Sequence, residues 1–244
     1  MKVAAYQAPL ATSGIPDTLA LIREQVARCE DLGVEILCCP EAILGGLADY
    51  APDPFSIAIS IENGDLDQLL SPLTSKTVTT ILGLTEIDRQ GRLFNAAVIW
   101  HCGTILGHYR KLHPFIRKSV YQAGSDTPVF TARGLTFGIV ICRDSTFPEP
   151  ARAMASKGAT AIFIPTNCGL PVNRANPKIV EEARSCDVAM ARENGVCVVR
   201  ADVAGETAEL MSYGASGLVD QGGRVLCSAR EHQADLIFAE ISTM

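Results

Sequence analysis

The sequence is poor in the residues that mark several common kinds of functional site. Its four histidines form no cluster, and its nine cysteines include no Cys-x-x-Cys pair with the spacing of a metal site. It contains no run of lysines and arginines, and its formal net charge is −6. Because binding to a phosphate backbone depends on clustered basic side chains, these features exclude a nucleic-acid partner. We expect neither a structural metal nor a cofactor.

Long apolar runs are missing as well. No uninterrupted apolar stretch approaches the roughly 18–20 residues of a membrane span. The N-terminal stretch MKVAAYQAPLATSG lacks the apolar region of a signal peptide. The cysteine count is odd, and most cysteines lie in apolar runs such as ILCCP, GIVIC and VCVV, which is not the pattern of a secreted disulfide framework. The sequence therefore predicts a reduced, cytoplasmic protein with no membrane contact.

Short apolar runs separated by turns organise the chain, which is 48% hydrophobic and can bury a sizeable core. Apolar residues at three- and four-residue steps between Asp17 and Gly33 predict a helix that stops at Gly33. No linker-like stretch interrupts the pattern, so we expect one domain over residues 1–244. Strands are expected at 2–7, 34–41, 79–88, 93–100, 103–111, 135–142, 159–167, 196–202 and 234–242, a hairpin at 216–229, and further helices at 66–77, 149–158 and 178–194. Alternating strands and helices with inserted hairpins predict a layered α/β sandwich with mixed sheets.

Three ionisable or reactive residues lie where an apolar strand is expected to stop. Glu41 follows EILCCP, Lys111 follows TILGHYR, and Cys142 ends LTFGIVI. Each residue also has an ordinary structural interpretation. In that interpretation Cys142 is a small buried core residue, Glu41 is a solvated acid in a loop, and Lys111 is a surface charge next to Arg110. Because α/β folds gather their sites where strand ends meet loops, the three residues also qualify as one site.

Together these residue types suit acyl transfer. A thiol attacks well only as a thiolate and needs a neighbouring base or cation to form it. A carboxylate can take the thiol proton and later deliver it to a leaving amine. A lysine can stabilise the negative charge on the attacked carbonyl oxygen. The scarcity of histidine fits this chemistry, although His113 competes with Glu41 as the base.

The sequence around these residues resembles the nitrilase superfamily, the carbon–nitrogen hydrolases. The resemblance is carried by CPEAILGG around Glu41, YRKLHP around Lys111, and GIVICRDSTFPEPARAMASKGA around Cys142. VAAYQAP, IPTNCGLP, ARENGVCVVRAD and YGASGLVDQGGRVL also fit, in family order and across almost the whole chain. The resemblance implies a four-layer αββα sandwich with two mixed β-sheets, and a homodimer or higher homo-oligomer.

The resemblance also implies the roles of individual residues. Glu41 would be the general base, Lys111 the transition-state stabiliser and Cys142 the nucleophile, with the backbone N–H of Arg143 in the oxyanion hole. Arg143 and Asn167 would contact the substrate. The implied activity is hydrolysis of a small amide through a cysteine thioester. A nitrilase, an N-carbamoyl hydrolase and a weakly active binding or regulatory protein are the alternatives.

The chain departs from the family pattern in two places. Many members carry a second glutamate after the lysine, whereas HPFIRKSVYQAGSD has none; the expected position is near 117–119, and Asp126 is a candidate substitute. Arg143 follows the nucleophile, and its planar guanidinium suits a carboxylate. Arg143 is therefore a candidate ligand for an acidic substrate group, or a partner of Asp144 or Glu149.

Overall fold

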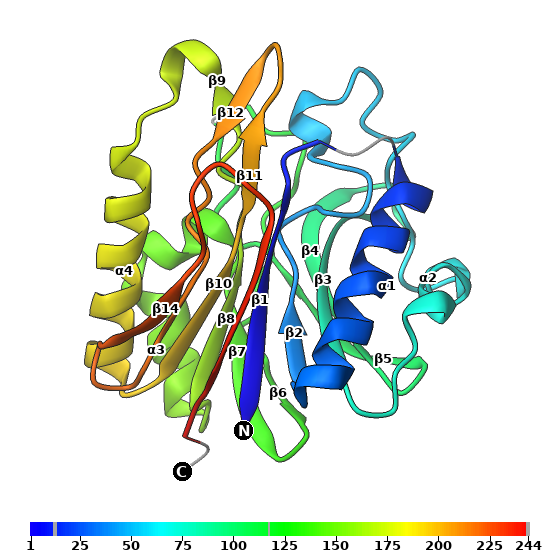
Figure 1. Ribbon diagram of the computed structural model, residues 1–244. Helices are drawn as coiled ribbons and strands as arrows, with labels where there is room; N and C mark the ends of the chain where they lie inside the picture. Colours follow the sequence, from blue (N-terminus) through cyan, green and yellow to red (C-terminus); the bar gives the residue numbers. More distant parts are fainter. Residues whose placement is uncertain (12–13, 117, 243–244) are drawn as a thin grey trace.

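Two β-sheets packed face to face form the centre of the protein, with helices on both outer faces (Figure 1). The computed structural model describes residues 1–11, 14–116 and 118–242. Helices α1 (Ile15–Leu32) and α2 (Asp65–Leu70) cover the first sheet, and α3 (Pro148–Ser156) and α4 (Lys178–Asn194) cover the second. The expected αββα sandwich with two mixed sheets is confirmed.

The first sheet has nine strands within the described residues, in the order β5-β4-β3-β2-β1-β11-β12-β9, with β15 also paired to β1. β1 is parallel to β2 and β11, β2 is parallel to β3, and β3, β4 and β5 are antiparallel. The strands are β1 (Lys2–Pro9), β2 (Ile36–Cys38), β3 (Thr79–Ile87), β4 (Leu93–His101), β5 (Thr104–Arg110), β9 (Leu170–Pro171), β11 (Val203–Glu206), β12 (Leu210–Ser212) and β15 (Asp235–Glu240).

The second sheet has the order β14-β13-β10-β8-β7-β6. Its central strands, β7, β8 and β10, are parallel, and the outer ones are antiparallel. The strands are β6 (Val129–Ala132), β7 (Leu135–Ile139), β8 (Ala161–Pro165), β10 (Cys197–Ala201), β13 (Gly217–Val219) and β14 (Val225–Ser228). The parallel centre directs the carboxyl ends of β7 and β8 to one edge, where Cys142 and Asn167 follow.

The two faces of β1 bury different parts of the core. Val3 and Ala5 belong to the cluster between the sheets, whereas Ala4 and Tyr6 pack in the cluster that includes the buried face of α1. Such alternation is the period-two signature of a strand that is covered on both faces. It makes the first sheet a rigid platform between a helix layer and the second sheet.

Several expected elements are shorter than the sequence pattern suggested. The helix expected at 66–77 ends as α2 at Leu70 and continues as a 3₁₀ turn from Ser71 to Leu73, where Pro72 lacks the N–H that an α-helix needs. The strand expected to reach Cys142 ends at Ile139. Short strands β6, β9, β11 and β12 were not expected, because two to four residues carry too little periodicity to predict a strand.

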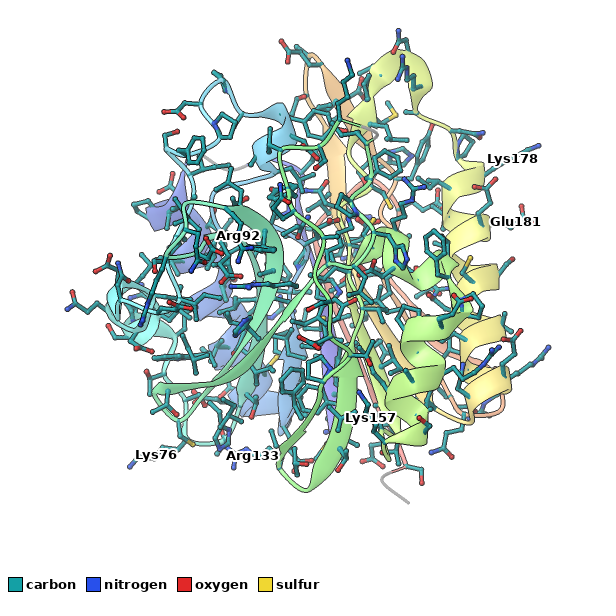
Figure 2. The ribbon with its side chains drawn as sticks, turned by 180° about the vertical axis from the view of Figure 1, so that it is seen from behind. Lys76, Arg92, Arg133, Lys157, Lys178 and Glu181 are labelled. Carbon is teal, nitrogen blue, oxygen red and sulfur yellow. The ribbon has the colours of Figure 1, made fainter. Side chains whose placement is uncertain are left out.

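Charged side chains in the first turn of α4 face outward. Figure 2 shows Lys178 and Glu181 projecting away from α4, on the side opposite the second sheet. Among the described residues, no helix is both long enough and apolar enough to cross a membrane.

Candidate active site

The three residues expected to form a site line one cavity of about 100 Å³. Glu41 lies three residues after the end of β2, Lys111 directly follows β5, and Cys142 begins the 3₁₀ helix η3 (Cys142–Thr146) beyond β7. The side chains of Glu41 and Lys111 are 2% and 4% exposed, while Cys142 is half-buried. Glu41 is therefore no solvated loop acid, and Lys111 is no surface charge.

The turn that carries Glu41 packs directly on β3 at Gly83. A Cβ atom at Gly83 would lie 2.5 Å from the Pro40 carbonyl oxygen and 2.8 Å from the Glu41 carbonyl carbon, so only glycine fits. The Leu44 N–H also donates to the Gly83 carbonyl oxygen at 3.1 Å. This contact sets the height of the Glu41 backbone above the first sheet.

Three donors hold the Glu41 carboxylate. Oε1 accepts from Lys111 Nζ at 2.5 Å and from Asn95 Nδ2 at 2.7 Å, and Oε2 accepts from the backbone N–H of Asn167 at 3.0 Å. These donors come from the end of β5, from β4 and from the loop after β8, so both sheets orient one carboxylate. The three bonds together fix the positions of both carboxylate oxygens.

Lys111 stays charged despite its burial. Burial lowers the pKa of Lys111, but the negative charge and the hydrogen bond of the Glu41 carboxylate offset this and raise the pKa above its usual value. The Lys111 N–H donates to the Asn95 carbonyl oxygen at 2.8 Å, which holds the lysine backbone against β4. The cavity therefore contains a fixed positive charge next to the Glu41 carboxylate.

Cys142 has a backbone conformation that is uncommon for residues other than glycine, with φ of +46°. The buried carboxylate of Asp144 stabilises the turn. It accepts from the Tyr109 hydroxyl at 2.7 Å, and from the N–H groups of Leu112 at 3.2 Å and His113 at 2.8 Å. Asp144 thereby joins the segment after Lys111 to the turn that begins with Cys142. A half-buried thiol on a turn that is held by a buried carboxylate suits a nucleophile.

A second cysteine lies against Cys142. Interaction with the Cys142 side chain and burial raise the pKa of Cys168 well above its usual value. The Cys168 N–H donates to Asp202 Oδ1 at 2.9 Å, so the residue is also anchored by its backbone. Cys168 therefore lines the cavity beside Cys142.

The substrate-contact residues expected from the sequence occupy different environments. Asn167 lines the cavity, and its N–H binds Glu41. Arg143 is not among the residues that line the cavity. Its guanidinium donates to the carbonyl oxygens of Pro114 and Phe115, whose residues do line it. A pairing of Arg143 with Asp144 or Glu149 is therefore not the arrangement observed.

His113 and Asp126 lie outside the cavity. His113 stacks on Phe147 with ring centroids 3.9 Å apart, and its Nδ1 lies 3.0 Å from Asp144 Oδ1. Asp126 lines a separate hollow next to Arg92 and Arg110. Arg117 is the first of the positions 117–119 at which the sequence pattern places the second glutamate of the family, and it lies outside the described residues.

The remaining cavity wall is mostly apolar. Leu47, Tyr50, Phe115, Leu170 and Ile179 contribute to it, together with one further carboxylate from Asp49. Asp49 accepts from the Ser119 hydroxyl at 2.9 Å and from the Val120 N–H at 2.8 Å. Among the described residues, no cluster of three metal-ligating side chains was found.

Sequence reasoning missed Asn95, Asp49 and Cys168. Asn95 left one signal, because it is a single amide inside the otherwise apolar run LFNAAVIW. A buried polar group needs a partner, and the Asn95 partner is Glu41, 54 residues away. Asp49 and Cys168 left no comparable signal.

The family comparison identifies the chemistry that this arrangement serves. The family model described as carbon-nitrogen hydrolase matches residues 2–243. The chain belongs to the carbon-nitrogen hydrolase family. The resemblance to the nitrilase superfamily found in the sequence is confirmed, and with it the assignment of the chain as a carbon–nitrogen hydrolase.

Individual relatives agree with this assignment. A Pyrococcus abyssi protein named nitrilase is 31% identical over 213 residues, which are 86% of this chain and 77% of that protein. An (R)-stereoselective amidase from a Pseudomonas species is 29% identical over 197 residues, or 80% and 69% of the two chains. The solved carbon-nitrogen hydrolase of Helicobacter pylori G27 superposes with a TM-score of 0.87 at 22% identity, covering 99% of this chain and 88% of that one. At that identity the structural likeness shows the fold.

Proposed function

We propose that this carbon–nitrogen hydrolase cleaves small amides, with Cys142 as nucleophile, Glu41 as general base and Lys111 as oxyanion stabiliser. One observation supports this proposal above the others. A half-buried thiol, a buried carboxylate and a buried ammonium line a single cavity, and the last two are 2.5 Å apart. The relative named as an amidase supports the substrate class.

The proposed reaction begins when Glu41 takes the Cys142 proton as the sulfur bonds to the amide carbon. The carbonyl electron pair moves to oxygen, where Lys111 and the backbone N–H of Arg143 stabilise it. Glu41 then gives the proton to the departing nitrogen as the carbon–nitrogen bond breaks, which leaves a thioester on Cys142 and releases ammonia or an amine. Glu41 next takes a proton from a water that attacks the thioester carbon. It passes this proton to the sulfur as the carbon–sulfur bond breaks, which releases the carboxylic acid and restores the thiol. No cofactor takes part.

The size of the cavity favours a small acyl group. A volume of about 100 Å³ is well below the roughly 300–1,000 Å³ of pockets that hold drug-sized ligands. The mainly apolar wall favours an acyl group without charge. For Arg143, direct contact with the substrate stays a prediction; the bonds to Pro114 and Phe115 support a role in shaping the wall.

The test is the intact mass of the protein after brief mixing with a panel of small amides, compared with a Cys142→Ala variant. We expect a mass gain equal to the acyl group in the wild type only, together with released ammonia. Lys111→Ala should lower the rate by about 10²–10³, the usual loss for one oxyanion donor. Wild-type turnover by the Cys142→Ala variant would refute the proposal.

Nitriles are the second substrate class to include, because the P. abyssi relative is named a nitrilase. The same thiolate can attack a nitrile carbon, so equal Cys142 dependence is expected and product analysis separates the two reactions. We further propose that the chain acts as a homodimer or higher homo-oligomer in the cytoplasm, and sedimentation velocity would test the assembly.

A further inference from the structure

A buried ion pair lies behind the active site. Arg200 on β10 is 2% exposed and Asp187 on α4 is fully buried. Arg200 Nε donates to both carboxylate oxygens of Asp187 at 3.0 Å, and Nη2 donates to Oδ1 at 2.5 Å. Replacing such a pair by apolar residues is often neutral or stabilising, so its presence is weak evidence for a role in stability.

Arg184 holds Asp187 from the other side. Its guanidinium lies 3.3 Å from Asp187 Oδ2 and donates to the carbonyl oxygens of Ala215 and Ser216. This guanidinium fills the space that a Cβ atom at Gly217 would need. Asp187 is thus fixed between two arginines, and it fixes Arg200 in turn.

The remaining donors of Arg200 reach both halves of the site. Nη2 donates to the Ser145 hydroxyl at 3.0 Å, and Ser145 donates to the Cys142 carbonyl oxygen at 2.7 Å. Nη1 donates to the Thr166 hydroxyl at 2.9 Å. The Thr166 carbonyl oxygen accepts from the Glu41 N–H at 3.2 Å. The Arg200 guanidinium therefore binds both Ser145, in the turn that begins with Cys142, and Thr166, at the end of β8 where the Glu41 backbone is bound.

Arg200 keeps its positive charge despite its burial, and it lies close to the candidate active site. Burial lowers the pKa of Arg200, but Asp187 offsets this and raises the pKa above its usual value. The thiols of Cys142 and Cys168 lie within electrostatic reach of the guanidinium. Arg200 is thus a second buried cation near Cys142, on a different strand from the one that precedes Lys111.

We propose that Arg200, fixed by Asp187, is a positioning residue that sets Cys142 through Ser145 and Glu41 through Thr166. This inference rests on the proposed function, in which Cys142 attacks and Glu41 transfers the proton. A planar fork with several donors can hold two turns at once, which a lysine in the same place could not do.

Two conservative variants test the connections and leave the ion pair in place. Ser145→Ala removes the hydroxyl that joins Arg200 to the Cys142 carbonyl oxygen. Thr166→Val removes the hydroxyl that binds Arg200, and it keeps the backbone carbonyl oxygen that accepts from the Glu41 N–H. Ser212→Ala is the matched control, because Ser212 is also buried and also donates to a carbonyl oxygen, that of Val203, at 2.7 Å. The readouts are kcat and KM for the best amide of the panel, the alkylation rate of Cys142 by iodoacetamide, and the midpoint of urea unfolding.

We expect each test variant to lower kcat about tenfold, with KM within about twofold of wild type, because small misplacement of reacting groups is costly. Ser145→Ala should also slow the alkylation of Cys142, while the urea midpoints stay close to that of the control. Test variants with the kcat of the control would overturn the proposal, as would a rise in KM alone. The alkylation rate needs no turnover. If the wild type hydrolyses no amide of the panel, the proposed function is refuted. Slower alkylation of Cys142 in Ser145→Ala than in the wild type would still support the positioning role.

Discussion

Replacement of Gly83 by alanine tests whether the close approach of the Glu41 turn to β3 sets catalysis. The added Cβ would lie 2.5 Å from the Pro40 carbonyl oxygen, in contact with backbone that cannot rotate away. Because ordinary contacts begin near 3.4 Å, the turn must retreat by about 1 Å. The bonds of Glu41 to Lys111 at 2.5 Å and to the Asn167 N–H at 3.0 Å would then stretch or break.

We expect this change to lower kcat/KM by about 10², the cost of misplacing a reacting group by about 1 Å. Overpacking should also lower the free energy of unfolding by about 1–3 kcal/mol. Ammonia release from the best amide and urea unfolding measure the two effects. Gly107→Ala on β5 is the control, since its Cβ would meet a movable ring atom, Phe130 Cε1, at 2.7 Å. A Gly83→Ala variant with kcat/KM within about threefold of the Gly107→Ala value would refute the reasoning.

Three other changes have defined outcomes. Asp144→Asn replaces one acceptor oxygen by an N–H₂ group, which faces the N–H donors of Leu112 or His113 and cannot accept from them. The free energy of unfolding should therefore fall by about 1–3 kcal/mol, and an unchanged urea midpoint would contradict this. Asp49→Asn should raise the ratio of kcat/KM for acidic amides to kcat/KM for neutral amides by about fivefold. The Asp49 carboxylate and a substrate carboxylate about 4 Å apart repel by about 1 kcal/mol even in water. The same ratio in the wild type and the variant would contradict this. Burial raises the pKa of Cys38. The folded state therefore keeps a proton that the unfolded chain loses above about pH 8.5, and the free energy of unfolding should fall with pH by about 1.4 kcal/mol per unit. Cys38→Ala should lack this part of the slope in urea titrations, and identical slopes would count against it.

The three residues proposed for catalysis could be singled out from the sequence because each lies next to a recognisable strand. The apolar runs before Glu41, Lys111 and Cys142 are local features, and local periodicity predicts the ends of strands well enough to single out the residue beyond each end. The helix at Lys178–Asn194 was predicted with the same bounds that the structure has. The resemblance to the nitrilase superfamily then implied the four layers, which the structure confirmed.

The tertiary structure decided how these residues are held. The partners of Glu41 come from positions 95, 111 and 167, and each contact spans 54 or more residues of chain. The connections of Arg200 to Ser145 and Thr166 span 55 and 34 residues. A single sequence carries no signal for such pairings, because they depend on the register and packing of two sheets and not on local propensity. The sequence by itself thus singled out the three groups proposed to do the chemistry, whereas the packing of the sheets determined their distances and the cavity they share.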